Sequence, residues 1–174
     1  LAAGLAEAGL ETLILDLDAQ GHVATSLGAH TNHGLQQFLV DGAPARQCTT
    51  QLRKRLYAIV GDSRQAQIDL WLAQQADGRD RLLARRMAEH DGRYDVVVMD
   101  CSPAMSLLNV NALVYADHVL IPVSCDYLSL LGVKQMLKTL EQVNRKHGGH
   151  VDILGIVPTM YDRRNRISDE AVKT

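Results

Sequence analysis

Two apolar runs in the sequence end in carboxylates. LILDLDAQGH (13–22) carries Asp16 and Asp18, and YDVVVMD (94–100) ends at Asp100. Side chains alternate between the faces of a strand, so Asp16 and Asp18 are expected to point to the same side. Ligands of open α/β sheets bind beyond the carboxyl ends of the strands. The spacing therefore predicts a ligand site built from acids of different strands.

The chemistry of this site follows from its residue types. Three acids without a His or Cys cluster favour a hard cation, and Mg²⁺ is commonly held by one or two carboxylates together with substrate phosphates. Such an ion would also relieve the repulsion between neighbouring acids. The alternative interpretation is that Asp16 and Asp100 only end their strands and face solvent.

The segment DCSPAMS (100–106) follows the second acid directly. Ser102 and Pro103 predict a stiff turn, which could respond to a bound phosphate and move with it, or could be an ordinary turn. Cys101 lies beside them, but no His is near in sequence to activate it as a nucleophile. We therefore favour a phosphate-sensing loop over covalent catalysis.

A second segment, TMYDRRNR (159–166), is locally basic in a chain of net charge -2. Its arginines, Arg163, Arg164 and Arg166, favour a contact with DNA phosphates. The alternative is a solvated loop before a helix. Because the net charge is slightly negative, any binding to nucleic acid must come from such a local patch.

The bulk composition limits the class of protein. The chain has 174 residues, 47% of them hydrophobic, which predicts a single folded domain with a sizeable core. The three cysteines lie far apart, which argues against a zinc site or disulfide framework and favours a reducing cytoplasm. We expect no membrane span and no signal peptide. Because the first and last segments resemble interrupted helices, we also expect the chain to be cut at both ends.

Alternating strand and helix patterns predict an α/β fold, a predominantly parallel sheet with helices on both faces. A helix is expected to end at Gly9, and the charges of 63–91 are expected to form a solvated, helix-rich face. The run 94–100 is typical of a central strand. The expected strands are 11–17, 56–61, 94–100, 118–124 and 151–160, and the further helices are 22–28, 34–42, 107–117 and 128–148.

Three stretches together resemble the ParA/Soj-type partition ATPases, which belong to the deviant-Walker P-loop group that also includes MinD. They are LAAGLAEAGLETLILDLDAQGHVATSLG, YDVVVMDCSPAMSLLNVNALVYADHVLIPVSCDYLSLLGV and ILGIVPTMYDRRNRIS. The resemblance covers most of the chain and is weak only in about 30–93. Several ordered motifs match together, which is more specific than any single motif.

The resemblance implies a three-layer, P-loop NTPase-like fold and an ATPase in plasmid or chromosome partitioning. ATP and Mg²⁺ are the implied cofactors. ATP would join two subunits into a homodimer, the dimer would bind DNA nonspecifically, and a ParB-like centromere-binding protein would stimulate hydrolysis. The implied location is the bacterial cytoplasm, in association with the nucleoid and without a membrane.

The resemblance also assigns roles to residues. Asp16 would lie in the magnesium shell through a water, Asp100 would be the Walker B acid behind the magnesium, and Asp18 would orient the attacking water. The remaining assignments are Gln20 and Gly21 in the first switch, residues 101–106 with Ser102 and Pro103 in the second, Met160 and Tyr161 near the adenine, and Arg163, Arg164 and Arg166 at the DNA.

Two departures from the family pattern have consequences. Ala19 stands where the family usually has proline, and the Gly-rich phosphate loop with its lysines is not found in the 174 residues. We therefore describe the chain as one incomplete nucleotide-binding domain, 1–174, and expect it to bind ATP weakly by itself. The alternatives are a MinD-like positioning ATPase, a non-catalytic module without a phosphate loop, and a receiver-like phosphoacceptor, which lacks the adjacent acidic pair.

Overall fold

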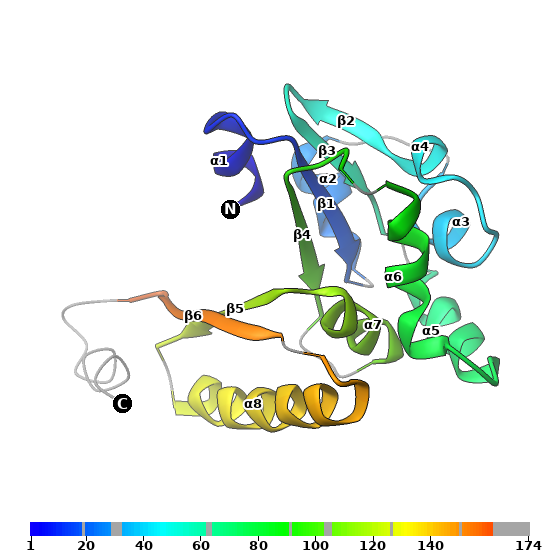
Figure 1. Cartoon of the computed structure of the whole chain (residues 1–174). Coiled ribbons are helices and arrows are strands. Elements are labelled where there is room, and N and C mark those ends of the chain that lie inside the picture. The colour runs from blue at the N-terminus through cyan, green and yellow to red at the C-terminus, as the bar shows by residue number, and fades with distance from the viewer. Residues whose placement is uncertain are drawn as a thin grey trace. The chain divides into compact units, whose positions relative to one another are not determined.

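The computed structural model describes residues 1–18, 20–28, 33–61, 64–90, 92–102, 106–125, 127–149 and 151–161. The chain divides into two compact units, Leu1–Tyr115 and Ala116–Thr174. Each unit has its own sheet, and Figure 1 labels the helices and strands. No helix in the described ranges has the length and apolar character needed to cross a membrane.

The unit Leu1–Tyr115 contains a four-stranded sheet with the order β2-β3-β1-β4. Strand β1 is parallel to both β3 and β4, and β2 is antiparallel to β3. The strands are β1 (Thr12–Leu17), β2 (Thr50–Arg53), β3 (Leu56–Ile59) and β4 (Val96–Cys101). The helices are α1 (Ala2–Glu7), α2 (His22–Leu27), α3 (Leu35–Leu39), α4 (Ala45–Cys48), α5 (Gln65–Gln74), η1 (Arg79–Arg81), α6 (Leu82–Met87), η2 (Ala88–His90) and α7 (Leu107–Tyr115).

Strand β1 is the centre of this unit, and every one of its residues is buried. Leu13 and Leu15 face a core built with α3 to α7. Ile14 faces the opposite core, built with α1 and α2. Alternation along one strand therefore supplies both cores. This confirms the prediction of a mostly parallel sheet with helices on both faces.

The turn after α1 explains how the chain enters β1. Gly9 has a φ of 104°, a conformation that costs glycine little and other residues much. Its carbonyl accepts a 2.7 Å hydrogen bond from Nη1 of Arg55, at the β2–β3 turn. A Cβ at Gly9 would lie 2.9 Å from that same nitrogen. The predicted helix stop at Gly9 is therefore confirmed.

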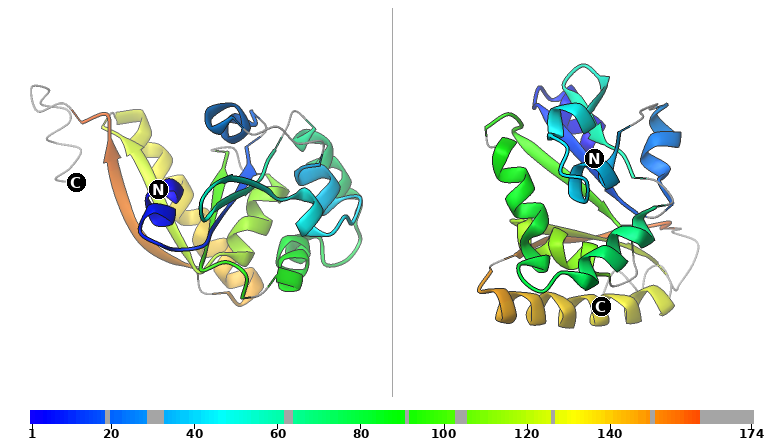
Figure 2. Two further views of the ribbon diagram at one scale, coloured as in Figure 1. Left: turned by 90° about the horizontal axis from the view of Figure 1, so that it is seen from above. Right: turned by 90° about the vertical axis from the view of Figure 1, so that its right-hand side faces the viewer.

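The described residues of the unit Ala116–Thr174 form a parallel strand pair and one long helix. Its elements are β5 (His118–Ser124), α8 (Tyr127–His147) and β6 (Asp152–Thr159). Helix α8 contacts β5 and runs alongside the pair, as Figure 2 shows. The boundaries of all three elements agree with the sequence-based ranges to within one or two residues.

Two features of the first sheet differ from expectation. Strand β4 is an edge strand of the described four-stranded sheet and not a central one. Its apolar run, which suggested burial on both faces, is only half-buried. Strand β2 was not predicted, because TQLR (50–53) is short and polar, with its half-buried and exposed positions alternating. Its position is determined by antiparallel pairing with β3.

Candidate functional site

The structure brings Asp16 and Asp100 together at the carboxyl ends of adjacent strands. The two residues are direct Cα partners in the parallel β1–β4 pair. Partners in such a pair point to the same face of the sheet. The residues two positions earlier, Ile14 and Val98, pack in the same core, which fixes that face as the one covered by α1 and α2. Two carboxylates therefore share one rim of the sheet.

The Asp16 side chain is fully buried, with 0% of its surface exposed. Burial raises the pKa of its carboxyl above 3.8, and the charge of Asp100 adds to the increase. Backbone N–H groups of Asp18, Gly61 and Val23 act in the opposite direction by donating to the carboxylate. The balance leaves an acid whose ionised form would be stabilised by a cation.

The turn after β1 places Asp18 and Gly21 at the start of α2. The backbone N–H of Asp18 lies 3.4 Å from Oδ1 of Asp16, and the N–H of Gln20 donates to Oδ1 of Asp18 at 2.9 Å. Gly21 donates to the Asp18 carbonyl at 3.0 Å and has a φ of 60° before α2 begins. The predicted first-switch residues thus form a compact turn next to the buried acid, while Ala19 lies outside the described residues.

Cys101 follows Asp100 and is exposed as a residue. Desolvation of its thiol, with a further contribution from Asp100, nevertheless raises the pKa to about 12. The thiol is therefore protonated at neutral pH and is a poor nucleophile. This agrees with the preference for phosphate chemistry over covalent catalysis.

The donor set fits a magnesium ion that is shared with a phosphate ligand. Within the described ranges, no group of three or more His, Cys, Asp or Glu side chains could hold a metal by itself. Mg²⁺ needs only one or two carboxylates when phosphates and waters complete its shell. Buried Asp16 and exposed Asp100 supply such a pair of carboxylates. The arrangement suits a hydrated ion that arrives with its nucleotide.

The other predicted site residues are placed less completely. Ser102 is half-buried and follows β4. Met160 has a φ of 55° and is exposed, as is Tyr161, and both belong to the unit Ala116–Thr174. Pro103 and the three arginines Arg163, Arg164 and Arg166 lie outside the described residues. Among the described residues, the structure therefore brings together Asp16 and Asp100, with the turn of Asp18 and Gly21 directly after β1.

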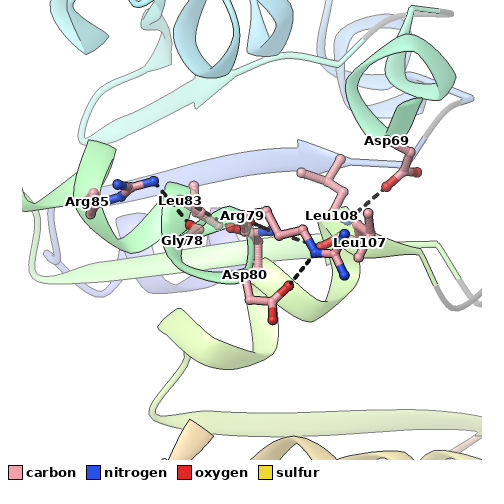
Figure 3. Close-up of polar contacts among 9 residues, drawn as sticks. Asp69, Gly78, Arg79, Asp80, Leu83, Arg85, Leu107 and Leu108 are labelled. Atoms are coloured by element: carbon pink, nitrogen blue, oxygen red, sulfur yellow. Dashed lines mark hydrogen bonds and ion pairs between the residues drawn. The ribbon is translucent and has the colours of Figure 1, made fainter. Parts of the chain in front are cut away.

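Sequence reasoning missed a set of polar residues around the start of α7. Asn111 is 1% exposed, and its side chain contacts the backbone of three residues, Arg79, Leu83 and Leu107. Asp69 of α5 contacts the backbone of Leu108, as Figure 3 shows. The available signal was asparagine at positions 109 and 111 in the otherwise apolar segment LLNVNALVY (107–115). Such asparagines in an apolar helix indicate specific buried hydrogen bonds.

The chain is similar to several known proteins. Residues 1–153 match the family AAA_31, described as an AAA domain. The chain is 33% identical over 178 residues to "Chromosome partitioning protein ParA" of Caulobacter vibrioides, covering 99% of this chain and 67% of that protein. It is also 33% identical over 175 residues to "Chromosome-partitioning ATPase Soj" of Treponema pallidum, covering 99% of this chain and 68% of that protein.

Among solved structures, one titled cobyrinic acid a,c-diamide synthase from Mycobacterium smegmatis is similar, with a TM-score of 0.92 and 30% identity. The match covers 99% of this chain and 71% of that one, which was solved with bound ADP and magnesium. The fold is therefore that of the ParA-like P-loop NTPases. Family, fold and coverage agree, and the chain belongs to the AAA_31 family and, within it, to the ParA/Soj-type partition ATPases.

Proposed function

We propose that this chain is the part of a partition ATPase that holds the magnesium and the attacking water. The observation that carries the proposal is the pairing of Asp16 with Asp100, one buried and one exposed, on one face of the sheet rim. Relatives named ParA and Soj support partitioning as the cellular role. Residues 1–174 would form one incomplete nucleotide-binding domain.

In the proposed mechanism, Asp16 and Asp100 would hold the magnesium ion. Asp18 would orient a water molecule for attack on phosphorus. Bound Mg²⁺–ATP would supply the phosphoryl group and the positive charge that offsets both acids. Catalysis of this kind depends mainly on positioning and charge neutralisation. The turn Gln20–Gly21 and the segment 101–106 would respond to the terminal phosphate, with Ser102 and Pro103 in the second switch.

The remaining parts of the proposal concern partners. ATP would join two subunits, and Arg163, Arg164 and Arg166 would contact DNA phosphates without sequence preference. Met160 and Tyr161 would lie near the adenine. A ParB-like protein would stimulate hydrolysis, and the protein would act in the cytoplasm on the nucleoid.

The test uses the product of the complete open reading frame that encodes this chain. We expect Mg²⁺-dependent ATP hydrolysis that increases when DNA and the centromere-binding partner are added. Asp18→Asn should lower kcat about a hundredfold while ATP binding is retained, because the water loses its orienting group. Asp41→Asn is the matched control, since Asp41 is an exposed acid of the same unit. A product that neither binds nor hydrolyses ATP overturns the proposal.

A second candidate function comes from the similarity to the Mycobacterium smegmatis structures of cobyrinic acid a,c-diamide synthase. The same reading-frame product can be assayed with cobyrinic acid. ATP hydrolysis that requires cobyrinic acid, at a rate that DNA does not change, would favour this function over partitioning. Co-sedimentation with liposomes in an ATP-dependent manner would instead favour a MinD-like role.

A further inference from the structure

The start of α7 lies close in sequence to the acidic rim, the edge of the sheet that carries Asp16 and Asp100. Ser102 comes two residues after Asp100, and α7 begins at Leu107. The end of β4 and the first turn of α7 are therefore near neighbours along the chain. Contacts that hold this first turn are candidates for positioning Asp100.

Asp69, a residue of α5, accepts a hydrogen bond from the first turn of α7. Its Oδ1 accepts a 2.9 Å hydrogen bond from the backbone N–H of Leu108, 39 positions further along the chain. Figure 3 shows the Asp69 carboxylate directed at this amide. The first N–H groups of a helix have no partner within the helix, and a carboxylate there is favoured by the helix dipole. Asp69 thus acts as a cap contributed by another helix.

The same turn is tied back to the end of β4. Nδ2 of Asn109 donates to the Ser102 carbonyl at 2.7 Å. The backbone N–H of Asn109 donates to Oγ of Ser106 at 3.2 Å. Leu108 and Asn109 are adjacent, so the contact from Asp69 and the contact to Ser102 act on one turn. The path from Asp69 to Asp100 is continuous through hydrogen bonds and backbone.

Asn111 anchors the body of α7 to the segment before it. Its Oδ1 accepts from the N–H of Leu83 at 3.1 Å, and its Nδ2 donates to the Arg79 carbonyl at 2.8 Å. Beside this anchor, Arg79 forms an ion pair with Asp80, which Figure 3 also shows. Because Asn111 fixes α7 independently, loss of the Asp69 contact should displace the first turn without detaching the helix.

We propose that Asp69 is a positioning residue for the acidic rim. It acts through the first turn of α7 and Asn109, which determine the position of Ser102 and therefore of Asp100. The inference rests on the proposed function, because it assigns a catalytic consequence to that position. Asp69 itself touches no reacting group. The inference thereby assigns a role near the ATPase site to a residue of the segment 63–91, interpreted from sequence as a solvated face.

The test compares Asp69→Ala, Asp69→Asn and Asp77→Ala in the complete reading-frame product. Asp77 is an exposed acid in the connection between α5 and η1, which makes it the matched control. We expect Asp69→Ala to lower kcat for ATP about tenfold with KM changed less than about threefold, because a displaced Asp100 would weaken the transition state more than it weakens ATP binding. Asp69→Asn should restore most of kcat, because its amide oxygen still accepts from Leu108.

A kcat unchanged in folded Asp69→Ala overturns the inference. Equal losses in Asp69→Ala and Asp69→Asn also overturn it, because an acceptor at position 69 would then be irrelevant. If the wild-type product shows no ATPase activity, the proposed function fails separately. The positioning contact is then decided by amide exchange: Leu108 and Asn109 should exchange faster in Asp69→Ala than in Asp77→Ala, and equal exchange rejects it.

Discussion

Asp16 combines full burial with a second carboxylate next to it on the neighbouring strand. Both features penalise the ionised form, and three backbone N–H groups only partly offset the penalty. A group of this kind destabilises the folded chain at neutral pH unless a cation is bound. A buried acid at the end of β1 therefore lowers stability at neutral pH, and the proposed role in holding magnesium gives a reason for its position.

The stability of the chain should therefore depend on pH through Asp16. Its folded pKa is raised above 3.8, so the favourable contribution is complete below that pH and is lost as the pH rises through the folded value. Asp16→Asn removes this loss and should raise the free energy of unfolding at pH 7, with little difference from wild type at pH 3.5. Urea unfolding at a series of pH values measures the change. A less stable Asp16→Asn at pH 7 would contradict this account.

Cys101 provides a second prediction at the residue scale. With a pKa of about 12, its thiol should react with iodoacetamide at pH 8 at least about a hundredfold more slowly than free cysteine. Asp100→Asn should accelerate the reaction, because the neighbouring negative charge contributes to the high pKa. Mass spectrometry of the labelled peptide measures the rate of labelling. The peptide that carries Cys101 is identified by the loss of its label in Cys101→Ser. Labelling as fast as free cysteine would show that the thiol is not desolvated.

At the scale of elements, Arg86 joins α6 to the chain around α3. Its Nε donates to the Phe38 carbonyl at 2.9 Å and its Nη2 to the Ala43 carbonyl at 2.5 Å. Its guanidinium lies 5.1 Å from the centre of the Phe38 ring. One partly buried side chain thus satisfies the Phe38 carbonyl near the end of α3 and the Ala43 carbonyl beyond that helix, and it packs on an aromatic ring.

Arg86→Ala should therefore lower the free energy of unfolding by about 2 kcal/mol, because both carbonyls lose a charged donor. Arg86→Lys should recover less than half of this, since an ammonium group cannot reproduce the fork. Arg85→Ala is the control: Arg85 is exposed, makes one 3.1 Å contact with Gly78, and should change stability by less than about 1 kcal/mol. Chemical denaturation of the three variants measures these changes in the free energy of unfolding. Equal losses at positions 85 and 86 would remove the special role of Arg86.

At the scale of the whole molecule, the apolar surface of β6 stands out. Leu154 is 66% exposed and Ile156 50%, and Ile153 and Val157 of the same strand are exposed as well. Apolar residues on both faces are typical of strands buried within a parallel sheet. Apolar strand surface that is accessible to solvent promotes association between chains.

The chain should consequently self-associate as its concentration rises. Ile156→Lys should slow this association several-fold, because a charge on an accessible strand opposes pairing with another chain. Leu70→Lys is the matched control, since Leu70 is 66% exposed but lies on helix α5. Static light scattering over a concentration series measures the effect. The same reduction from both variants would indicate a general effect of net charge and not one of β6.

The sequence alone determined those features that depend on local pattern. Apolar runs ending in Asp16 and Asp100 located two strands and their acids, and the alternation of strand and helix predicted the parallel sheet with covered faces. The boundaries of β5, α8 and β6 followed from the same periodicity. Local patterns carry this information because neighbouring residues in one element share its geometry.

Tertiary structure decided everything that depends on which distant segments pair. The register that places Asp16 opposite Asp100, the position of β4 at a sheet edge and the antiparallel strand β2 all come from pairing between distant segments. So does the contact of Asp69 with Leu108, across 39 positions. The periodicity of the sequence does not identify such partners, because the packing of the whole core selects them.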